Sequence, residues 1–147
     1  MKRLLAILLS MLLPPASTAQ QPAWETDPTE TEVGIHVIPN FGDDPVIHSP
    51  DIDEAAVRSA LQSVDWVNGF HQVVVVLSPG TSMEVGGSLD PEHGLSAMYR
   101  NRREGIAAVT REAPETLGDL EAILLAFIEP GDGWQQVQAF NFHYGVR

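Results

Sequence analysis

Residues 82–100 constrain the fold more than any other stretch of the chain. Apolar side chains alternate on both sides of a short acidic turn, as expected for two strands of one hairpin. The alternating residues are Met83, Val85, Leu95, Ala97 and Tyr99. Within the turn, Pro91 has a fixed φ and Gly94 a permissive one. The pattern predicts a sheet with this hairpin at its centre.

Further strand signals lie on both sides of the hairpin. Residues 73–76 are four consecutive valines, and a run without polar alternation indicates a strand covered on both faces, at 71–77. Strands are also predicted at 33–38, 106–110 and 134–143, whereas 41–50 is predicted to be a loop because glycine and proline interrupt it. The strand at 71–77, the two strands of the hairpin and the strand at 106–110 are joined by short connections. These four strands should therefore form an antiparallel meander.

Two helices are predicted. The first spans about 51–65, with Ser49 as its cap and Pro50 at its first position. The second starts at a capping box of Thr116 and Asp119 and stops before Pro130. The predicted fold is therefore α+β, an antiparallel meander sheet of about five to six strands with two helices packed on one face.

The first nineteen residues have the pattern of a secretory signal peptide. Lys2 and Arg3 precede an apolar run that is too short to span a bilayer, and small residues at Ser17 and Ala19 suit cleavage. Residues 20–32 are acidic and interrupted by proline, which predicts a flexible leader. Residues 33–147 should form a single α+β domain, located in the periplasm or secreted.

Charge and cysteine content restrict the possible partners and chemistry. The net charge of −12 includes Lys2 and Arg3, so removal of residues 1–19 lowers it to −14. Such a surface repels nucleic acid and anionic lipid, and it favours solubility or a basic protein partner. We therefore expect no nucleic-acid partner and no stable membrane insertion after signal cleavage. The chain has no cysteine, which excludes thiol catalysis and cysteine-bound zinc.

Candidate catalytic and metal-binding residues are few. Glu84 with His93 or Asp90 could act as an acid–base pair in a small secreted hydrolase, but Glu84 lies between two inward-facing residues and should point to solvent. Histidines and aspartates between 36 and 53 could make the protein a metal-binding envelope domain, although no fixed ligand spacing is present. We predict no metal, no cofactor and no catalytic residue.

Two features could serve binding or structure. Gly86 and Gly87 would let a partner backbone approach the sheet closely, or would form a β-bulge. Tyr99 and Trp134 could belong to an exposed aromatic patch or to the core.

Residues 67–142 resemble small bacterial immunity proteins of polymorphic toxin and contact-dependent inhibition systems. The resemblance covers residues 84–90, residues 94–99, a proline-initiated helix ending near 125, and residues 131–134. It implies a non-catalytic inhibitor whose acidic surface matches the basic active site of one toxin, and the signal peptide would place that toxin in the periplasm. The residues expected to contact the partner are Glu84, Gly86, Gly87, Asp90, Glu92, Tyr99 and Trp134.

Overall fold

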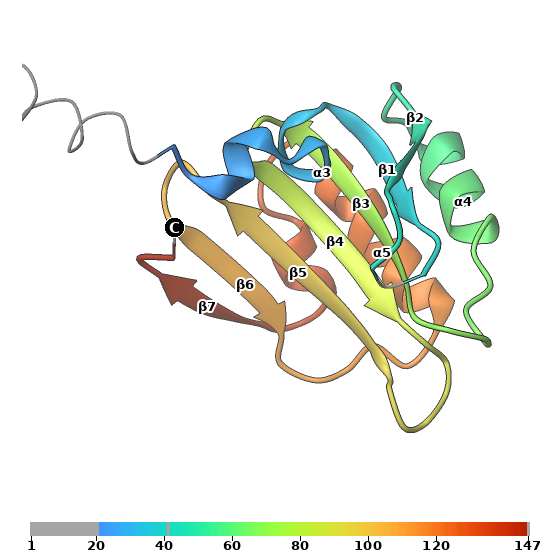
Figure 1. The fold of residues 1–147 in the computed structure, drawn as a ribbon. Helices are drawn as coiled ribbons and strands as arrows, with labels where there is room; N and C mark the ends of the chain where they lie inside the picture. The colour runs from blue at the N-terminus through green and yellow to red at the C-terminus, as the bar shows by residue number, and fades with distance from the viewer. Residues whose placement is uncertain (1–20, 41, 147) are drawn as a thin grey trace, which may run out of the picture.

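The computed structural model describes residues 21–40 and 42–146, and the predicted signal peptide lies outside them. One open sheet of seven strands dominates these residues, in the order β2-β1-β3-β4-β5-β6-β7 with every neighbouring pair antiparallel (Figure 1). The strands are β1 (Gly34–Ile38), β2 (Val46–Ser49), β3 (His71–Ser78), β4 (Thr81–Gly87), β5 (Leu95–Asn101), β6 (Ile106–Thr110) and β7 (Phe140–Tyr144). The predicted antiparallel sheet and its meander, β3 to β6, are confirmed, but the described part has seven strands rather than five or six.

The additional strand is β2, within the segment predicted to be a loop. Val46 and Ile47 pair with β1, and both side chains remain exposed at 56% and 44%. Pro45 and Pro50 bound this four-residue strand. The prediction was wrong because a short edge strand that buries no large side chain leaves only its turn residues as a signal.

The helix α4 (Glu54–Gln62) is shorter than predicted. Its cap is Asp53, whose side chain accepts a hydrogen bond from the backbone N–H of Ala56 at 2.8 Å. Ser49 instead accepts from the N–H of Asp51 ahead of the helix, so the predicted cap was wrong. The predicted buried stripe does form, since Val57, Ala60 and Leu61 are buried.

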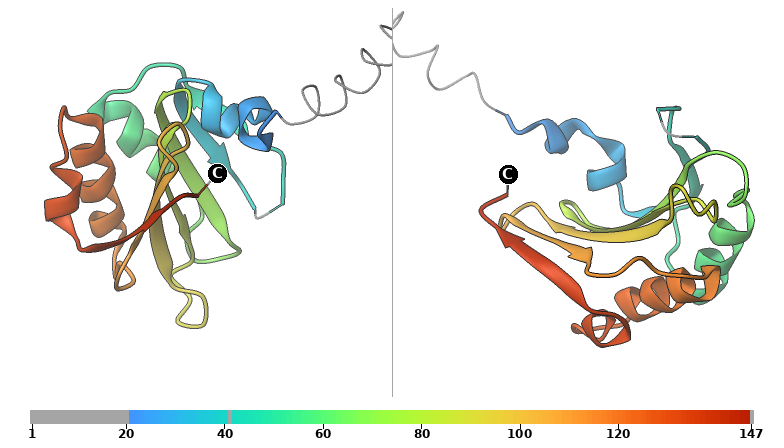
Figure 2. Two further views of the ribbon diagram at one scale, coloured as in Figure 1. Left: turned by 90° about the vertical axis from the view of Figure 1, so that its left-hand side faces the viewer. Right: turned by 90° about the horizontal axis from the view of Figure 1, so that it is seen from below.

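The helix α5 (Leu117–Ile128) starts at the predicted capping box. The Thr116 hydroxyl accepts from the N–H of Asp119, and the Asp119 carboxylate accepts from the N–H of Thr116. Its buried side chains are Leu120, Ile123, Leu124 and Phe127. With α4 it covers one face of the sheet (Figure 2). In all, the described residues contain four α-helices, two more than predicted.

Protonation of Asp119 should weaken this helix start. Hydrogen bonds from the N–H groups of Glu115 and Thr116 lower the pKa of the Asp119 carboxyl below its usual value. A carboxyl with a depressed folded-state pKa contributes stability above its unfolded pKa and loses it as pH falls through the folded one. We therefore expect wild type to be more stable than Asp119→Asn at about pH 7, and the difference in their free energies of unfolding, measured in urea, to shrink as the pH falls to about 3. A difference that is constant with pH would contradict this account.

The four valines of β3 are buried on both faces, as predicted. Val73 and Val75 belong to the core beneath α4 and α5. Val74 and Val76 alternate with them and are 2% and 0% exposed on the other face. Part of this second face is covered by the N-terminal segment, which packs on β3 and β4 (Figure 2).

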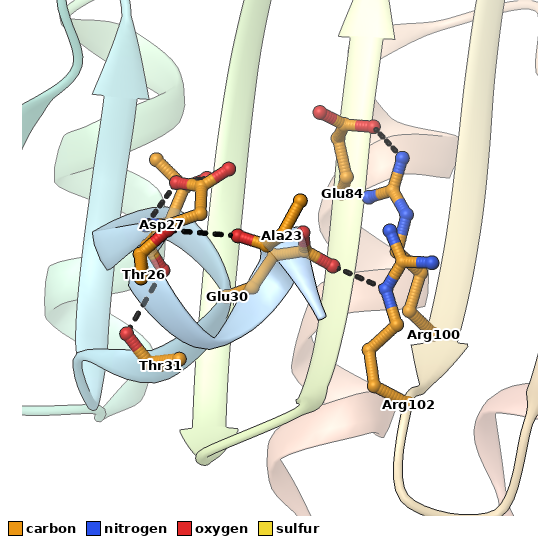
Figure 3. A network of polar contacts seen from close by, with 9 residues as sticks. Ala23, Thr26, Asp27, Glu30, Thr31, Glu84, Arg100 and Arg102 are labelled. Atoms are coloured by element: carbon orange, nitrogen blue, oxygen red, sulfur yellow. Dashed lines mark hydrogen bonds and ion pairs between the residues drawn. The ribbon is translucent and has the colours of Figure 1, made fainter. Parts of the chain in front are cut away.

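This N-terminal strap, residues 21–32, contains the short helix η1 (Ala23–Thr26) and α3 (Pro28–Thr31). Glu30 is buried and its carboxylate forms an ion pair with Arg102 at 2.6 Å (Figure 3). The Glu30 carbonyl accepts a hydrogen bond from the N–H of Gly80 at 2.7 Å. The predicted flexible leader is therefore wrong for residues 21–32, because partners distant in sequence fix this polar segment.

A helical turn replaces the first half of the last predicted strand. Residues 134–143 were predicted to be one strand, but α6 (Trp134–Val137) precedes β7. The turn places Trp134 beside Phe127 of α5 and leaves Gln136 exposed. A single helical turn followed by a strand can carry the same apolar and polar alternation as one longer strand.

Candidate partner-binding surface

Trp134 belongs to the core and Tyr99 packs against it, so the two do not make an exposed patch. Trp134 is 3% exposed, and its ring lies 4.7 Å from that of Tyr99 and 4.9 Å from that of Phe140, centroid to centroid. Tyr99 is half-buried, and this burial raises the pKa of its hydroxyl. The structure contradicts the prediction that Trp134 contacts a partner.

The glycine pair Gly86 and Gly87 serves close approach within the chain itself. β4 keeps a continuous register with β5 through both glycines, so there is no β-bulge in this pairing. Gly87 has φ of +112°, and a Cβ there would lie 2.1 Å from the Gly94 carbonyl oxygen. At Gly86 a Cβ would lie 3.0 Å from Cγ of Gln72. The space that the prediction assigned to a partner backbone is therefore occupied by the hairpin and by Gln72.

Glu84 lies on the second face of the sheet, as predicted from its position between two core residues. Its carboxylate accepts a hydrogen bond from Gln72 Nε2 at 2.7 Å and pairs with Arg100 at 3.2 Å (Figure 3). Asp90 and His93 lie beyond the end of β4, in the β4–β5 loop, 3.8 Å apart. The three residues of the hydrolase hypothesis are thus divided between strand and loop, and Arg100 compensates the charge of Glu84.

Three of the histidines and aspartates between 36 and 53 have separate structural roles. His36 bonds to the Glu32 carbonyl, His48 to the Ser59 hydroxyl, and Asp53 caps α4. Among residues 21–40 and 42–146, no three His, Asp or Glu side chains are arranged to hold a metal ion.

Three loops meet at one end of the sheet, because β1 and β4 end there and β3 begins there. They are residues 39–40 with 42–45, residues 63–70, and residues 88–94. The N–H of Leu89 donates to the carbonyl of Trp66 at 2.8 Å, which joins the second and third loops. The first loop adjoins the second, because the side chain of Asn40 lies against Gly69. A Cβ added to Gly69 would lie only 2.7 Å from Asn40 Oδ1. We refer to the three loops together as the acidic end.

Carboxylates and exposed apolar side chains share this end. Its acidic residues are Asp43, Asp44, Asp65, Asp90 and Glu92, all fully or partly exposed. The sequence of the three loops contains no lysine or arginine. Val67 is 66% exposed and Leu89 is 40% exposed. The acidic end therefore combines uncompensated negative charge with apolar side chains in contact with solvent.

Hydrogen bonds hold part of this charge in place. Asn68 donates from its side chain and its N–H to the carboxylate of Asp65, and the N–H of Val67 donates to the same group. Led by the bond from the Asn68 side chain, these contacts lower the pKa of Asp65, so it stays ionised. In the loop 88–94, the N–H of Glu92 donates to Asp90 at 3.0 Å.

The opposite end of the sheet has a different charge pattern. The β5–β6 loop there carries Arg102 and Arg103. Arg102 pairs with Glu30, and Arg103 donates to the carbonyl of Pro79 at 3.0 Å. Arginines thus lie among the carboxylates at that end, whereas the three loops of the acidic end contain none.

The predicted partner-binding residues are separated by the structure. Asp90 and Glu92 lie in the acidic end, Glu84 lies on the second face, and Trp134 lies in the core. The predicted set omitted Asp43, Asp44, Asp65, Val67 and Leu89. Because successive strands of an antiparallel meander alternate in direction, following their directions along the chain would have placed the loops that carry these residues at the same end of the sheet.

Comparison of the chain with protein-family models, with curated proteins and with solved structures finds no match. Within the part of the chain that the structure describes, no helix has the length and apolar character needed to cross a membrane.

Proposed function

We propose that this protein is an exported, non-catalytic binding protein, an immunity-type inhibitor that holds a bacterial toxin in the periplasm. The observation that carries the proposal is the acidic end: five carboxylates without a lysine or arginine around exposed Val67 and Leu89. The occupant that fits is a basic protein surface with an apolar group at its centre.

The arrangement suits rapid and specific association. Uncompensated carboxylates attract a basic partner and accelerate encounter, while apolar side chains that lose water in the complex supply affinity. The main-chain bond between Leu89 and Trp66 positions the two apolar loops before binding, which reduces the entropy lost on association. The pattern of a signal peptide supports a partner in the envelope.

Charge reversal at the acidic end tests this function. Asp44→Lys with Glu92→Lys changes two exposed carboxylates that make no side-chain hydrogen bond within the described residues. The control, Glu104→Lys with Glu129→Lys, makes the same charge change at exposed positions outside the three loops. The ligand is the protein encoded by the neighbouring gene, and the readouts are the association rate and Kd at low and high salt.

We expect the acidic-end variant to bind at least about tenfold more weakly than wild type, mainly through slower association, and the control to bind as wild type does. High salt should reduce this difference, because exposed charges are screened. An equal loss of affinity in the acidic-end variant and in the control would show that binding depends on the net charge of the protein and not on the position of the carboxylates. Absence of binding between wild type and the neighbouring gene product would overturn the proposed function.

A further inference from the structure

The two edges of the sheet differ in how they are protected. At the β2 edge, the strand has four residues between Pro45 and Pro50, and its pairing with β1 shifts register between Ile35 and His36. Short length, flanking proline and irregular pairing are features by which proteins prevent strand addition at an edge. The β2 edge is therefore a poor template for another strand.

The β7 edge, although it also has a short strand, lacks the flanking proline and the irregular pairing of the β2 edge. Its five residues pair with β6 in a continuous register, and among residues 21–40 and 42–146 no further strand pairs with it (Figures 1 and 2). The segment 133–146 contains no proline, aspartate, glutamate, lysine or arginine, although the chain has a net charge of −12. Tyr144 is 74% exposed, and Val137 on the preceding helix is 43% exposed.

The backbone groups that point outward can be identified from the pairing. The N–H of Arg111 donates to the carbonyl of Ala139, so the residues of β7 that bond to β6 are Ala139 and then every second residue. The N–H and C=O groups of Phe140, Phe142 and Tyr144 consequently face away from the sheet. They offer three donors and three acceptors to an added strand.

We propose that a second copy of this chain pairs with β7 in antiparallel orientation, forming a two-fold dimer centred on Phe142. This register bonds Phe142 to its own counterpart and sets Phe140 opposite Tyr144 of the second copy. Aromatic cross-strand pairs then lie on the helix-covered face, where Phe142 and Tyr144 already stack at 6.3 Å. On the other face, Asn141 lies opposite His143 of the second copy.

Charge favours a second copy over an unrelated strand. Two molecules that are each strongly acidic repel one another unless the contacting surfaces lack carboxylates. The segment 133–146 meets that condition on both sides of a two-fold axis. In the proposed register its aromatic residues also pair only with each other, as an isologous interface requires.

Exposed side chains of β7 allow a charge-exchange test. Asn141→Asp with His143→Asp places carboxylates opposite each other twice, whereas Asn141→Asp with His143→Lys places opposite charges together twice. Both positions are exposed. In the wild type Arg111 Nε donates a hydrogen bond to Asn141 Oδ1 at 3.0 Å, and the carboxylate of Asn141→Asp can accept the same bond. The control adds two carboxylates elsewhere, through Gln62→Glu and Ala122→Glu at exposed positions of α4 and α5.

Sedimentation velocity of the purified protein should show wild type partly dimeric at about 100 µM, consistent with a small interface. The double-aspartate variant should have a Kd for dimerisation about tenfold higher, and the aspartate–lysine variant should have a Kd at or below that of wild type. The control should match wild type. A wild type that remains monomeric at this concentration would overturn the proposal, as would equal dimerisation of all four proteins.

Amide hydrogen exchange locates the interface independently of these variants. The amides of Phe142 and Tyr144 should exchange more slowly as protein concentration rises, because they are bonded only in the dimer. The amides of Asn141 and His143, which bond to β6, should be protected at every concentration. Rapid, concentration-independent exchange at Phe142 and Tyr144 in a dimeric protein would place the interface elsewhere and refute the β7 pairing.

Discussion

Gly87→Ala is expected to lower the free energy of unfolding by about 3 kcal/mol or more, a large effect for a single alanine substitution in the central hairpin. Gly87 has φ of +112°, where a side chain is strained, and its Cβ would lie 2.1 Å from the Gly94 carbonyl oxygen. That oxygen also accepts the N–H of Ser88 at 3.0 Å. Relief of the clash would therefore separate the two strands of the hairpin.

Gly94→Ala is the matched control in the same loop. Gly94 also has a positive φ, +71°, but a Cβ there meets nothing within 4 Å. Only the backbone strain remains, and its expected cost is about 1–2 kcal/mol. Urea unfolding monitored by tryptophan fluorescence measures both variants. Equal losses would show that conformation alone, without the contact to Gly94, determines the requirement for glycine at 87.

Trp134→Ala is expected to cost about 3–5 kcal/mol, the range for removing a large buried aromatic side chain. The Trp134 ring contacts the rings of Tyr99, Phe127, Phe140 and Phe142. Its loss would leave a cavity between α5 and the sheet. Tyr144→Ala, at a residue that is 74% exposed, is the control and should change stability by less than about 0.5 kcal/mol in dilute solution.

Binding measurements on a folded variant separate the two roles considered for Trp134. Trp134→Phe keeps an aromatic ring between α5 and the sheet and should bind the proposed partner as wild type does, with a moderate loss of stability. If Trp134→Ala had the same free energy of unfolding as wild type but no longer bound the partner, Trp134 would contact the partner as predicted from the sequence. It would then not stabilise the core.

The features that sequence predicted well depend on neighbours in the chain. The valines at 73–76 indicate a strand covered on both faces without reference to any other segment. Thr116 and Asp119 form a capping box within one helical turn. The meander followed from loops too short for parallel connections. In each case the residues that determine the structure lie within a few positions of one another.

The features that sequence missed depend on distant partners. The strap is held by Arg102 and Gly80, far from Glu30 in the chain, and its own composition resembles a disordered leader. β2 forms because β1 offers an edge to pair with, since the two large apolar side chains of β2, Val46 and Ile47, stay exposed. Trp134 packs beside Phe127 because residues 134–137 form a helical turn. The local sequence pattern does not distinguish that turn from a strand.

The candidate site was predicted only in part for the same reason. Asp90 and Glu92 were identified because the turn they occupy is visible in the sequence. Asp65 and Val67 belong to a loop that meets them only through the order of the strands and the bond between Leu89 and Trp66. A surface assembled from three loops requires the topology before its members can be grouped.

The ion pair between strap and sheet also affects how the chain matures. Glu30 and Arg102 are separated by 72 positions, and synthesis proceeds from the N-terminus at about 5–20 residues per second. While the chain is being made, Glu30 must wait several seconds for its guanidinium partner. Until Arg102 is made, the ion pair cannot hold the strap over Val74 and Val76, and these valines are an apolar target for a chaperone from the time they are made.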